Sequence, residues 1–409
     1  MNSENSSLGL HTTEDYAALI GPEAVERILK KAERLRSARV GHLSSTLYGG
    51  GVAEILTPLT LLLNTMGVET GWRVIQGTPE FFSCTKKIHN ALQGEQVNLS
   101  DKEKAVYEEV IIENALRLHL EGHDAIIVHD PQPLPLIRHF RGSRAPWIWQ
   151  CHIDLSEPDK SIWDYVSGFV EQYTAAVFSL SEYAQDLPIP QLFIAPAINP
   201  FSVKNRELSD DEMRACLAYH RIPTDRPLVV QISRFDRWKD PGGVIEAVHL
   251  ARKQVDCTLV LLGNTAVDDP EAQVILETIH NSADERMIVV SVDDPLLVNT
   301  LQRKAAVVLQ KSIREGFGLT VTEAMWKGAA VIGGNVSGIR RQISHGQNGF
   351  LVDTVEQTAE RIVQLLQFPA LRRQIGAAAR ETVRENFLLS RLAEDWIDLL
   401  GSQIDPEMA

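Results

Sequence analysis

Short apolar runs alternate with longer amphipathic stretches along most of this chain. Each run is continuously apolar, which is typical of parallel strands that are covered by helices on both faces. The first series of expected strands is 72–76, 125–129, 147–153, 175–181 and 192–197. The second series is 228–234, 258–263, 287–292, 305–310, 329–334 and 349–352. The expected helices include 102–120, 162–173, 241–253, 270–281 and 354–366.

This alternation predicts an α/β fold with two doubly wound, Rossmann-like domains, because the strands are too many for one sheet of ordinary size. The break falls near 197–208, where proline, small polar residues and charges follow the fifth strand. We expect an N-terminal helical extension (1–37), a first Rossmann-like domain (38–198), a linker (199–206), a second Rossmann-like domain (207–385), and a C-terminal helix (386–409) that packs back on the first domain.

Composition excludes several functional classes. The 409 residues hold 40 Lys and Arg against 54 Asp and Glu, which gives a formal net charge of -14. Nucleic-acid and anionic-membrane surfaces need a basic field, so neither partner is expected. The acidic N-terminus does not resemble a signal peptide, and no apolar stretch reaches the roughly 20 residues of a spanning helix. The four cysteines lack C-x-x-C spacing, so we expect a cytoplasmic protein without a zinc site.

The strongest chemical motif is SIREGFGLTVTEAMWKG at 312–328, which follows an expected strand. Gly316 and Gly318 predict a tight loop, and a helix is expected to begin near Leu319. The amides and the dipole at the start of that helix favour anions.

Glu315 and Glu323 flank the start of this helix. One lies in the loop and the other about one turn into the helix, so both are expected at the same edge of the sheet. Carboxylates accept paired hydroxyl groups, which suits a sugar or ribose ring. The local alternative is a surface loop with a helix carboxylate that pairs with Lys327.

The spacing E-G-F-G-L-x-x-x-E resembles the E-x7-E motif of retaining glycosyltransferases of the GT-B fold, glycosyltransferase family 4. A second segment, QISRFDRWKD at 231–240, is similar to the family's S-R-x-x-x-x-K motif. The resemblance implies that Arg234 and Lys239 grip the pyrophosphate of a nucleotide-sugar donor, where two cations stabilise the departing diphosphate. An exposed basic pair on a turn is the alternative.

Glycines also precede a helix in the first half of the chain, in HLSSTLYGGGVAEIL at 42–56. Gly49, Gly50 and Gly51 are expected to let the backbone approach the donor's phosphate or sugar. The segment is neither G-x-G-x-x-G nor a Walker loop, which makes a dehydrogenase or P-loop enzyme improbable. A flexible turn is the alternative.

Two segments that end strands supply further candidates, QCHIDLS at 150–156 and HDPQPLP at 129–135. The resemblance places His152 beside the reacting carbon of the donor sugar, and a core or capping histidine is the alternative. Asp154 is a candidate acceptor-binding residue or else a helix N-cap. Asp130 is a candidate for acceptor hydroxyls, and an Asx turn is its alternative.

Over most of residues 14–400 the chain is similar to the trehalose glycosyltransferring synthases, on segments that include STLYGGGVAEIL, EFFSCTKKIHNALQG and WIWQCHIDLS. The resemblance implies two Rossmann-like domains that face each other across a cleft, an acceptor domain followed by a donor domain. It implies reversible transfer of glucose from UDP-, ADP- or GDP-glucose to free glucose, with retention. No cofactor is expected, and any Mg²⁺ effect would act through the nucleotide. Self-association as a homodimer is also implied.

The resemblance assigns the donor roles in the second half. Glu315 is implied near the glucose hydroxyls and Glu323 on the ribose, while the amides of Phe317, Gly318 and Leu319 hold sugar or phosphate oxygens. Gln150 stands where compared relatives carry arginine. The nucleotide base therefore stays open, as do a retaining trehalose phosphorylase, a different sugar acceptor, and a non-catalytic sugar- or nucleotide-binding relative.

Overall fold

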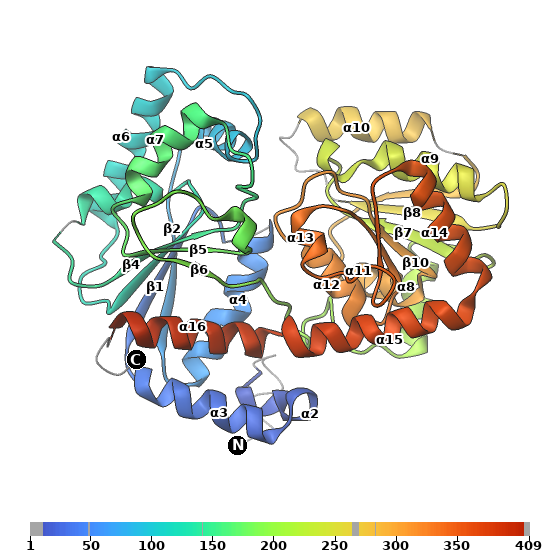
Figure 1. The fold of residues 1–409 in the computed structure, drawn as a ribbon, viewed down its shortest axis with the longest axis horizontal. Helices are drawn as coiled ribbons and strands as arrows, with labels where there is room; N and C mark the ends of the chain where they lie inside the picture. The colour runs from blue at the N-terminus through green and yellow to red at the C-terminus, as the bar shows by residue number, and fades with distance from the viewer. Residues whose placement is uncertain (1–10, 48–49, 141, 264–269, 283, 405–409) are drawn as a thin grey trace. The chain divides into compact units, whose positions relative to one another are not determined.

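The computed structural model describes residues 11–47, 50–140, 142–263, 270–282 and 284–404. The chain divides into two compact units, the first formed by residues 1–197 and 389–409 and the second by residues 198–388. Each unit is built on one six-stranded sheet whose paired strands run parallel (Figure 1). The segment 199–206, expected as a linker, lies inside the second unit, and the last helix lies in the first unit.

The sheet of the first unit has the order β2-β1-β3-β4-β5-β6. Its strands are β1 (Arg39–Ser44), β2 (Glu69–Val74), β3 (Ala125–His129), β4 (Trp147–Cys151), β5 (Ala175–Phe178) and β6 (Gln191–Phe193). Its helices are η2 (Thr13–Tyr16), α2 (Ala17–Ile20), α3 (Pro22–Ala32), η3 (Glu33–Leu35), α4 (Gly50–Thr65), α5 (Pro79–Leu92), α6 (Asp101–Arg117), η4 (Leu134–His139), α7 (Lys160–Val170), η5 (Ser181–Tyr183) and α16 (Leu389–Ile404).

The sheet of the second unit has the order β12-β11-β10-β7-β8-β9. Its strands are β7 (Leu228–Ile232), β8 (Thr258–Gly263), β9 (Met287–Ser291), β10 (Val307–Gln310), β11 (Val331–Gly334) and β12 (Phe350–Val352). Its helices are α8 (Asp210–Tyr219), η6 (Arg237–Lys239), α9 (Pro241–Ala251), α10 (Pro270–Asn281), α11 (Pro295–Lys304), α12 (Leu319–Trp326), α13 (Ser337–Arg340), α14 (Val355–Gln367) and α15 (Pro369–Asn386).

The prediction of two doubly wound parallel sheets is confirmed. Each expected strand overlaps an observed one, but the sequence analysis missed β1, which pairs with both β2 and β3. Its sequence, RVGHLS, places a glycine and three polar residues where a continuous apolar run was sought. His42 and Ser44 are nevertheless buried on this strand. Because polar side chains are buried on β1, the search for continuous apolar runs did not find this strand.

Each sheet has one topological switch point, where strands later in the chain are added on the opposite side of the first strands. In the first sheet this point lies between β1 and β3, and in the second sheet it lies between β7 and β10. In open α/β sheets the loops diverge there at the carboxyl ends of the strands, and this is where ligands bind. The candidate residues are therefore to be sought in the loops that follow these strands.

Helices cover both faces of the first sheet. One face carries an apolar core that includes Phe81, Tyr107, Trp149 and Phe169 and is covered by α5, α6 and α7. On the other side α16 contacts α3, α4 and β3 (Figure 1).

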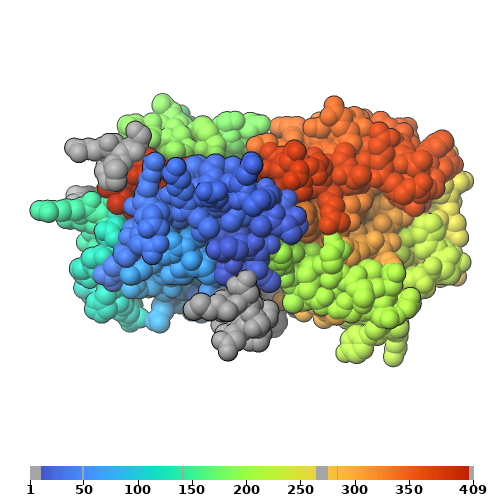
Figure 2. All heavy atoms as spheres, turned by 90° about the horizontal axis from the view of Figure 1, so that it is seen from below, coloured from blue at the N-terminus to red at the C-terminus, as the bar shows by residue number. Residues whose placement is uncertain are grey.

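The N-terminal helix α3 is attached to α16 by charge pairs. Arg27 bonds Glu394 at 2.8 Å and Lys31 bonds Asp398 at 2.7 Å. Figure 2 shows the N-terminal helices, in dark blue, at the surface of the first unit. The two ends of the chain thus complete the same unit.

In the second unit α12 packs against α15, and Gly376 of α15 lies against Gly328, which follows the end of α12. A Cβ atom built on Gly376 would lie 2.0 Å from the carbonyl oxygen of Gly328, so the close approach of these segments requires glycine at 376. Because α12 carries Glu323, this contact positions part of the candidate site.

We expect Gly376→Ala to destabilise the protein by about 1–3 kcal/mol, because the added methyl group forces α15 away from α12. Urea unfolding followed by circular dichroism measures the effect. Gly168→Ala in α7 is the control, since no heavy atom lies within 4 Å of its added Cβ. If both variants unfold at the same urea concentration as the wild type, the contact does not constrain the fold.

Candidate functional site

An ion pair joins the two loops at the switch point of the second sheet. Lys239 Nζ, in the turn after β7, lies 2.5 Å from Glu315 Oε2, in the loop after β10. Ser312 Oγ donates to the same carboxylate oxygen at 3.1 Å, and Gln310 Nε2 lies 3.4 Å from it. Two residues predicted separately from two motifs are thus in direct contact, and both side chains are largely buried.

A second ion pair, between buried Lys311 and half-buried Asp240, lies next to the first in the chain and was not found in the sequence. Lys311 Nζ bonds Asp240, which directly follows Lys239. Asp240 adopts a left-handed backbone conformation, with φ of 46°, and its carboxylate caps α9 by accepting from Gly243 N at 3.0 Å. Gln231 Nε2 donates to the carbonyl of Lys239 at 3.0 Å. These contacts hold the backbone on which Lys239 is mounted.

The turn into α12 is arranged as the motif predicted. Gly318 has φ of 87° and precedes the first helical residue, Leu319. A Cβ on Gly318 would lie 3.1 Å from Glu315 Cγ, so glycine leaves room for that side chain. Gln342 Nε2 donates to the carbonyl of Phe317 at 2.6 Å. The first amides of a helix lack intrahelical acceptors, so this turn presents donors suited to anionic oxygens.

Glu323 lies on the buried side of α12, and only 4% of it is exposed. Its Oε1 is 3.6 Å from Lys204 Nζ, in the segment expected as a linker. Lys327 bonds the carbonyl oxygen of Glu323 at 3.1 Å, together with Asn205 Oδ1 and Gln302 Oε1. The sequence analysis considered a pair between the Glu323 carboxylate and Lys327, but Lys327 bonds the backbone carbonyl of Glu323, and the carboxylate forms an ion pair with Lys204. The ribose role of Glu323 stays a prediction.

Arg234 is not gathered into the cluster of Lys239 and Glu315. Its side chain is 76% exposed and lies 3.4 Å from Asp236 Oδ2. The exposure of Arg234 fits the alternative given in the sequence analysis, an exposed basic residue on a turn. A diphosphate role for Arg234 therefore requires its side chain to turn toward a bound ligand.

The first unit brings His152 and Asp130 together at the carboxyl ends of β3 and β4. Asp130 has a left-handed φ of 61°, and its Oδ1 accepts the backbone N–H of His152 at 2.8 Å. Its own N–H donates to the carbonyl of Gln150 at 2.8 Å. One carboxylate oxygen of Asp130 therefore positions His152, and its role toward acceptor hydroxyls stays a prediction.

Two further histidines extend inward from His152 and were not singled out in the sequence. His129 Nδ1 lies 3.0 Å from His152 Nε2, and His42 Nδ1 lies 2.9 Å from His129 Nε2. Burial lowers the pKa of all three imidazoles, that of His42 to about 3, although Asp130 acts in the opposite direction on His152. All three are therefore neutral near pH 7. The position of His129 at the end of the apolar run AIIVH could have revealed it, whereas His42 lies on β1, the strand that the hydrophobic pattern missed.

The remaining predicted residues of the first unit are placed as follows. Asp154 is buried, and its Oδ1 accepts from the N–H and the hydroxyl of Ser156 at 2.9 and 2.6 Å. The N-cap alternative for Asp154 is wrong, because Asp159 caps α7; its acceptor role stays a prediction. Gly50 and Gly51 open α4 and are exposed, whereas Gly49 lies outside the described residues.

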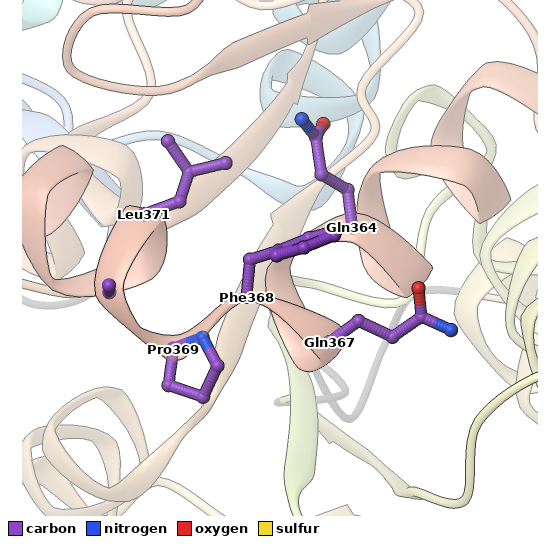
Figure 3. Close-up of a pocket in the computed structure, with 6 residues that line it drawn as sticks. Gln364, Gln367, Phe368, Pro369 and Leu371 are labelled. Atoms are coloured by element: carbon purple, nitrogen blue, oxygen red, sulfur yellow. The ribbon is translucent and has the colours of Figure 1, made fainter.

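A hollow on the surface of the second unit, lined by Gln364, Gln367, Phe368 and residues 369–371, lies at the turn between α14 and α15 (Figure 3). It contains none of the predicted residues. Among the described residues, no group of three His, Cys, Asp or Glu side chains is arranged to hold a metal ion. Within the same residues, no helix is long and apolar enough to cross a membrane.

Comparisons with known proteins agree along the whole chain. Residues 42–185 match the family described as trehalose synthase, N-terminal domain, and residues 217–382 match glycosyl transferases group 1. A trehalose synthase from Pyrococcus horikoshii is 41% identical over 409 residues and covers 97% of each chain. One from Rubrobacter xylanophilus is 40% identical, over 95% of this chain and 96% of the relative. A trehalose phosphorylase from Pleurotus pulmonarius is 26% identical, over 97% of this chain and 62% of that protein.

Solved structures share the fold at low sequence identity. An α,α-trehalose 6-phosphate synthase from Burkholderia multivorans superposes with a TM-score of 0.72 at 16% identity, over 91% of this chain and 100% of the other. A sucrose-phosphate synthase from Thermosynechococcus elongatus gives 0.69 at 18% identity, over 88% and 98%. This likeness shows that the two Rossmann-like units have the GT-B type of fold.

Lys327 gives the site a testable pH dependence. Burial lowers the pKa of Lys327 to about 7 from an ordinary value of 10.5, although Glu323 opposes the change. Between about pH 7 and roughly 10 the unfolded chain therefore holds a proton on Lys327 that the folded protein loses. The contribution of Lys327 to the free energy of unfolding thus rises with pH in this range.

We expect the free energy of unfolding of the wild type to rise relative to that of Lys327→Met as the pH is raised from 7 toward 9.5, because only the wild type has this shifted lysine. Urea unfolding at several pH values measures the difference. Lys304→Met, at an exposed lysine, controls for the loss of one positive charge. A difference that does not change with pH would show that Lys327 stays protonated in the folded protein throughout this range.

Proposed function

Because the chain belongs to the trehalose synthase family of glycosyltransferases, we propose that it transfers glucose from a nucleoside-diphosphate glucose to free glucose. The products are α,α-trehalose and the nucleoside diphosphate, the anomeric configuration is retained, and the reaction runs in both directions. The observation that carries this proposal is the contact of Lys239 with Glu315 at the switch point of the second sheet. It combines a cation for a diphosphate with a carboxylate for sugar hydroxyls.

We propose that Lys239 and Arg234 stabilise the departing diphosphate. Negative charge develops on the oxygen that bridges the sugar and the phosphate as this bond breaks, and fixed cations lower the energy of that state. The amides at Phe317, Gly318 and Leu319 add donors at the positive end of the α12 dipole. Lys239 is already held in place by its buried surroundings, whereas exposed Arg234 would move on binding.

The Lys239–Glu315 pair also defines what a donor must replace. Two largely buried charges neutralise each other before the donor arrives. A diphosphate offers Lys239 a new anionic partner, and the hydroxyls of glucose offer Glu315 new hydrogen-bond donors. We propose that donor binding replaces the ion pair by a diphosphate on Lys239 and sugar hydroxyls on Glu315, so that neither group is left buried without a partner.

The chemical step that we propose is a front-side attack by the acceptor through an oxocarbenium-like state. Because the acceptor hydroxyl attacks the anomeric carbon directly, no protein nucleophile is required, and because the departing phosphate takes the proton of that hydroxyl, no protein base is required. The protein supplies positioning, charge stabilisation and exclusion of water. His152 acts beside the reacting carbon, Asp130 and Asp154 are candidates for acceptor hydroxyls, Glu323 for the ribose, and Gly49, Gly50 and Gly51 for the donor.

An NMR-monitored reaction series tests the function. The protein is mixed with UDP-, ADP- or GDP-glucose and free glucose, and the anomeric protons are followed. We expect an α,α-1,1-linked disaccharide together with the matching nucleoside diphosphate, which would also identify the base. The control reaction omits glucose.

The same experiment has a second arm, because a named trehalose phosphorylase is among the similar proteins. Trehalose is mixed with inorganic phosphate, and glucose 1-phosphate is sought. Formation of glucose 1-phosphate here, without disaccharide in the first arm, would overturn the proposed donor and support a retaining phosphorylase. No product in either arm would overturn the proposed function and leave a different sugar acceptor or a non-catalytic sugar- or nucleotide-binding relative.

The two cations give a sharper test of the leaving-group step. Lys239→Ala and Arg234→Ala should each lower kcat by about 10²-fold or more, because each removes a charge that stabilises the departing diphosphate. Steady-state kinetics with the preferred donor measures this. Arg214→Ala, at an exposed arginine of α8, is the matched control. An unchanged kcat in a folded variant removes that residue from the mechanism.

A further inference from the structure

The three histidines of the first unit form a diagonal line across neighbouring strands. His42 on β1 pairs in register with Ile127 on β3, and His129 lies two residues further along that strand. His129 pairs with Gln150 on β4, and His152 again lies two residues further. Steps of two residues keep all three side chains on the same face of the sheet. The line therefore runs from a deeply buried residue to the edge where ligands bind.

Each imidazole ring stacks on the next one in the line. The ring centroids of His42 and His129 are 5.2 Å apart, those of His129 and His152 are 5.4 Å apart, and both pairs are stacked. The nitrogen distances of 2.9 and 3.0 Å make a hydrogen bond at each step. A neutral imidazole has one N–H and one acceptor nitrogen, so the two hydrogen bonds must point in the same direction.

The buried end of the line determines that direction. Among the described residues, His42 Nε2 is a buried nitrogen without a hydrogen-bond partner, and the ring of Trp396 lies against His42 with a centroid distance of 6.1 Å. If the line ran inward, this nitrogen would carry a buried N–H without an acceptor, a rare and costly arrangement. If it runs outward, the same position is an unused lone pair. His42 Nδ1–H then donates to His129, and His129 Nδ1–H donates to His152.

We propose that His42 and His129 are positioning residues that hold His152 in one tautomer, with the proton on Nδ1 and the lone pair of Nε2 occupied by His129. The inference rests on the proposed function, in which His152 meets the donor sugar. Since Nε2 is used within the line, Nδ1 is the nitrogen left for a ligand. It acts as a hydrogen-bond donor toward a sugar or phosphate oxygen, and it does not act as a base.

Asp130 completes the arrangement from the outer side. Its carboxylate accepts the backbone N–H of His152 at 2.8 Å, which holds the main chain of this residue at the strand end. The backbone of His152 is thus held by Asp130 and its imidazole by His129. A histidine with one fixed tautomer presents a single polarity to the ligand, whereas a free imidazole exchanges between donor and acceptor.

Substitutions of His42 separate this role from simple packing. His42→Phe keeps an aromatic ring but removes the N–H that donates to His129, whereas His42→Asn keeps an amide N–H near the position of Nδ1. If His42 only fills the core, Phe is the milder change and Asn the more disruptive one, because Asn leaves a void and an unpaired polar group. If His42 directs the tautomer, activity follows the opposite order.

We expect His42→Phe to lower kcat by at least about 10-fold with little change in the donor KM, and His42→Asn to retain most of the activity. Leu43→Val, on the same strand but facing the opposite core, is the control for perturbation of β1. Thermal unfolding of all variants reports stability. A kcat for His42→Phe equal to that of wild type, or a variant order that follows stability, would overturn the proposal.

A spectroscopic readout tests the tautomer without reference to activity. Two-bond ¹H–¹⁵N spectra of protein labelled with ¹⁵N-histidine distinguish protonated from unprotonated ring nitrogens, and His152→Gln identifies the signals of His152. We expect His152 to carry its proton on Nδ1 in the wild type and to show both tautomers in His42→Phe. A wild-type proton on Nε2 would overturn the proposal.

The two readouts keep this inference distinct from the proposed function. If the wild type forms no disaccharide while the tautomer of His152 still depends on His42, the proposed function fails and the positioning role stands. If the wild type forms trehalose while the tautomer is the same in His42→Phe, the positioning role fails and the proposed function stands.

Discussion

Parallel strands end at one edge of their sheet, and this constraint gathers the chemistry of both units. Lys239 and Glu315 are far apart in the chain but follow β7 and β10, which are neighbours at the point where the strand order reverses. In the first unit His129 and His152 come together because β3 and β4 are adjacent and in register. In both cases the hydrogen bonds of the sheet set the separation of the side chains before any ligand binds.

Apart from exposed Arg234, the polar groups named near these edges are wholly or partly withdrawn from water, so each needs a partner. Lys239 is paired with Glu315, Lys311 with Asp240, and the histidines with each other. An unpaired buried charge costs several kcal/mol, so the ion pairs are needed for stable folding. The same side chains are also the groups that could bind a ligand. A ligand that replaces one partner must supply equivalent charge or hydrogen bonds. A nucleotide sugar, the donor proposed for this site, meets this requirement.

Support for the site comes from the backbone behind it. Glycine at 376 lets α15 approach α12, and Gln342 bonds the carbonyl of Phe317 in the turn that precedes this helix. In the first unit, α16 from the end of the chain covers His42 through Trp396. The groups that carry the proposed chemistry are therefore held by residues that are remote from them in sequence.

The sequence by itself determined the α/β class, the two sheets and the residues of the strong motifs, because apolar runs and glycine-rich turns depend on neighbours along the chain. Gly318, Leu319 and Glu315 lie in the predicted turn and helix start for that reason. Only the tertiary structure decided which side chains meet. It revealed β1, whose polar residues hid it, and joined His42 to His152. It also gave Glu323 a cation, Lys204, from a segment that had been expected to be a linker. Such contacts depend on strand order, register and burial. These are set by interactions between residues far apart in the chain, so the local sequence pattern does not predict them.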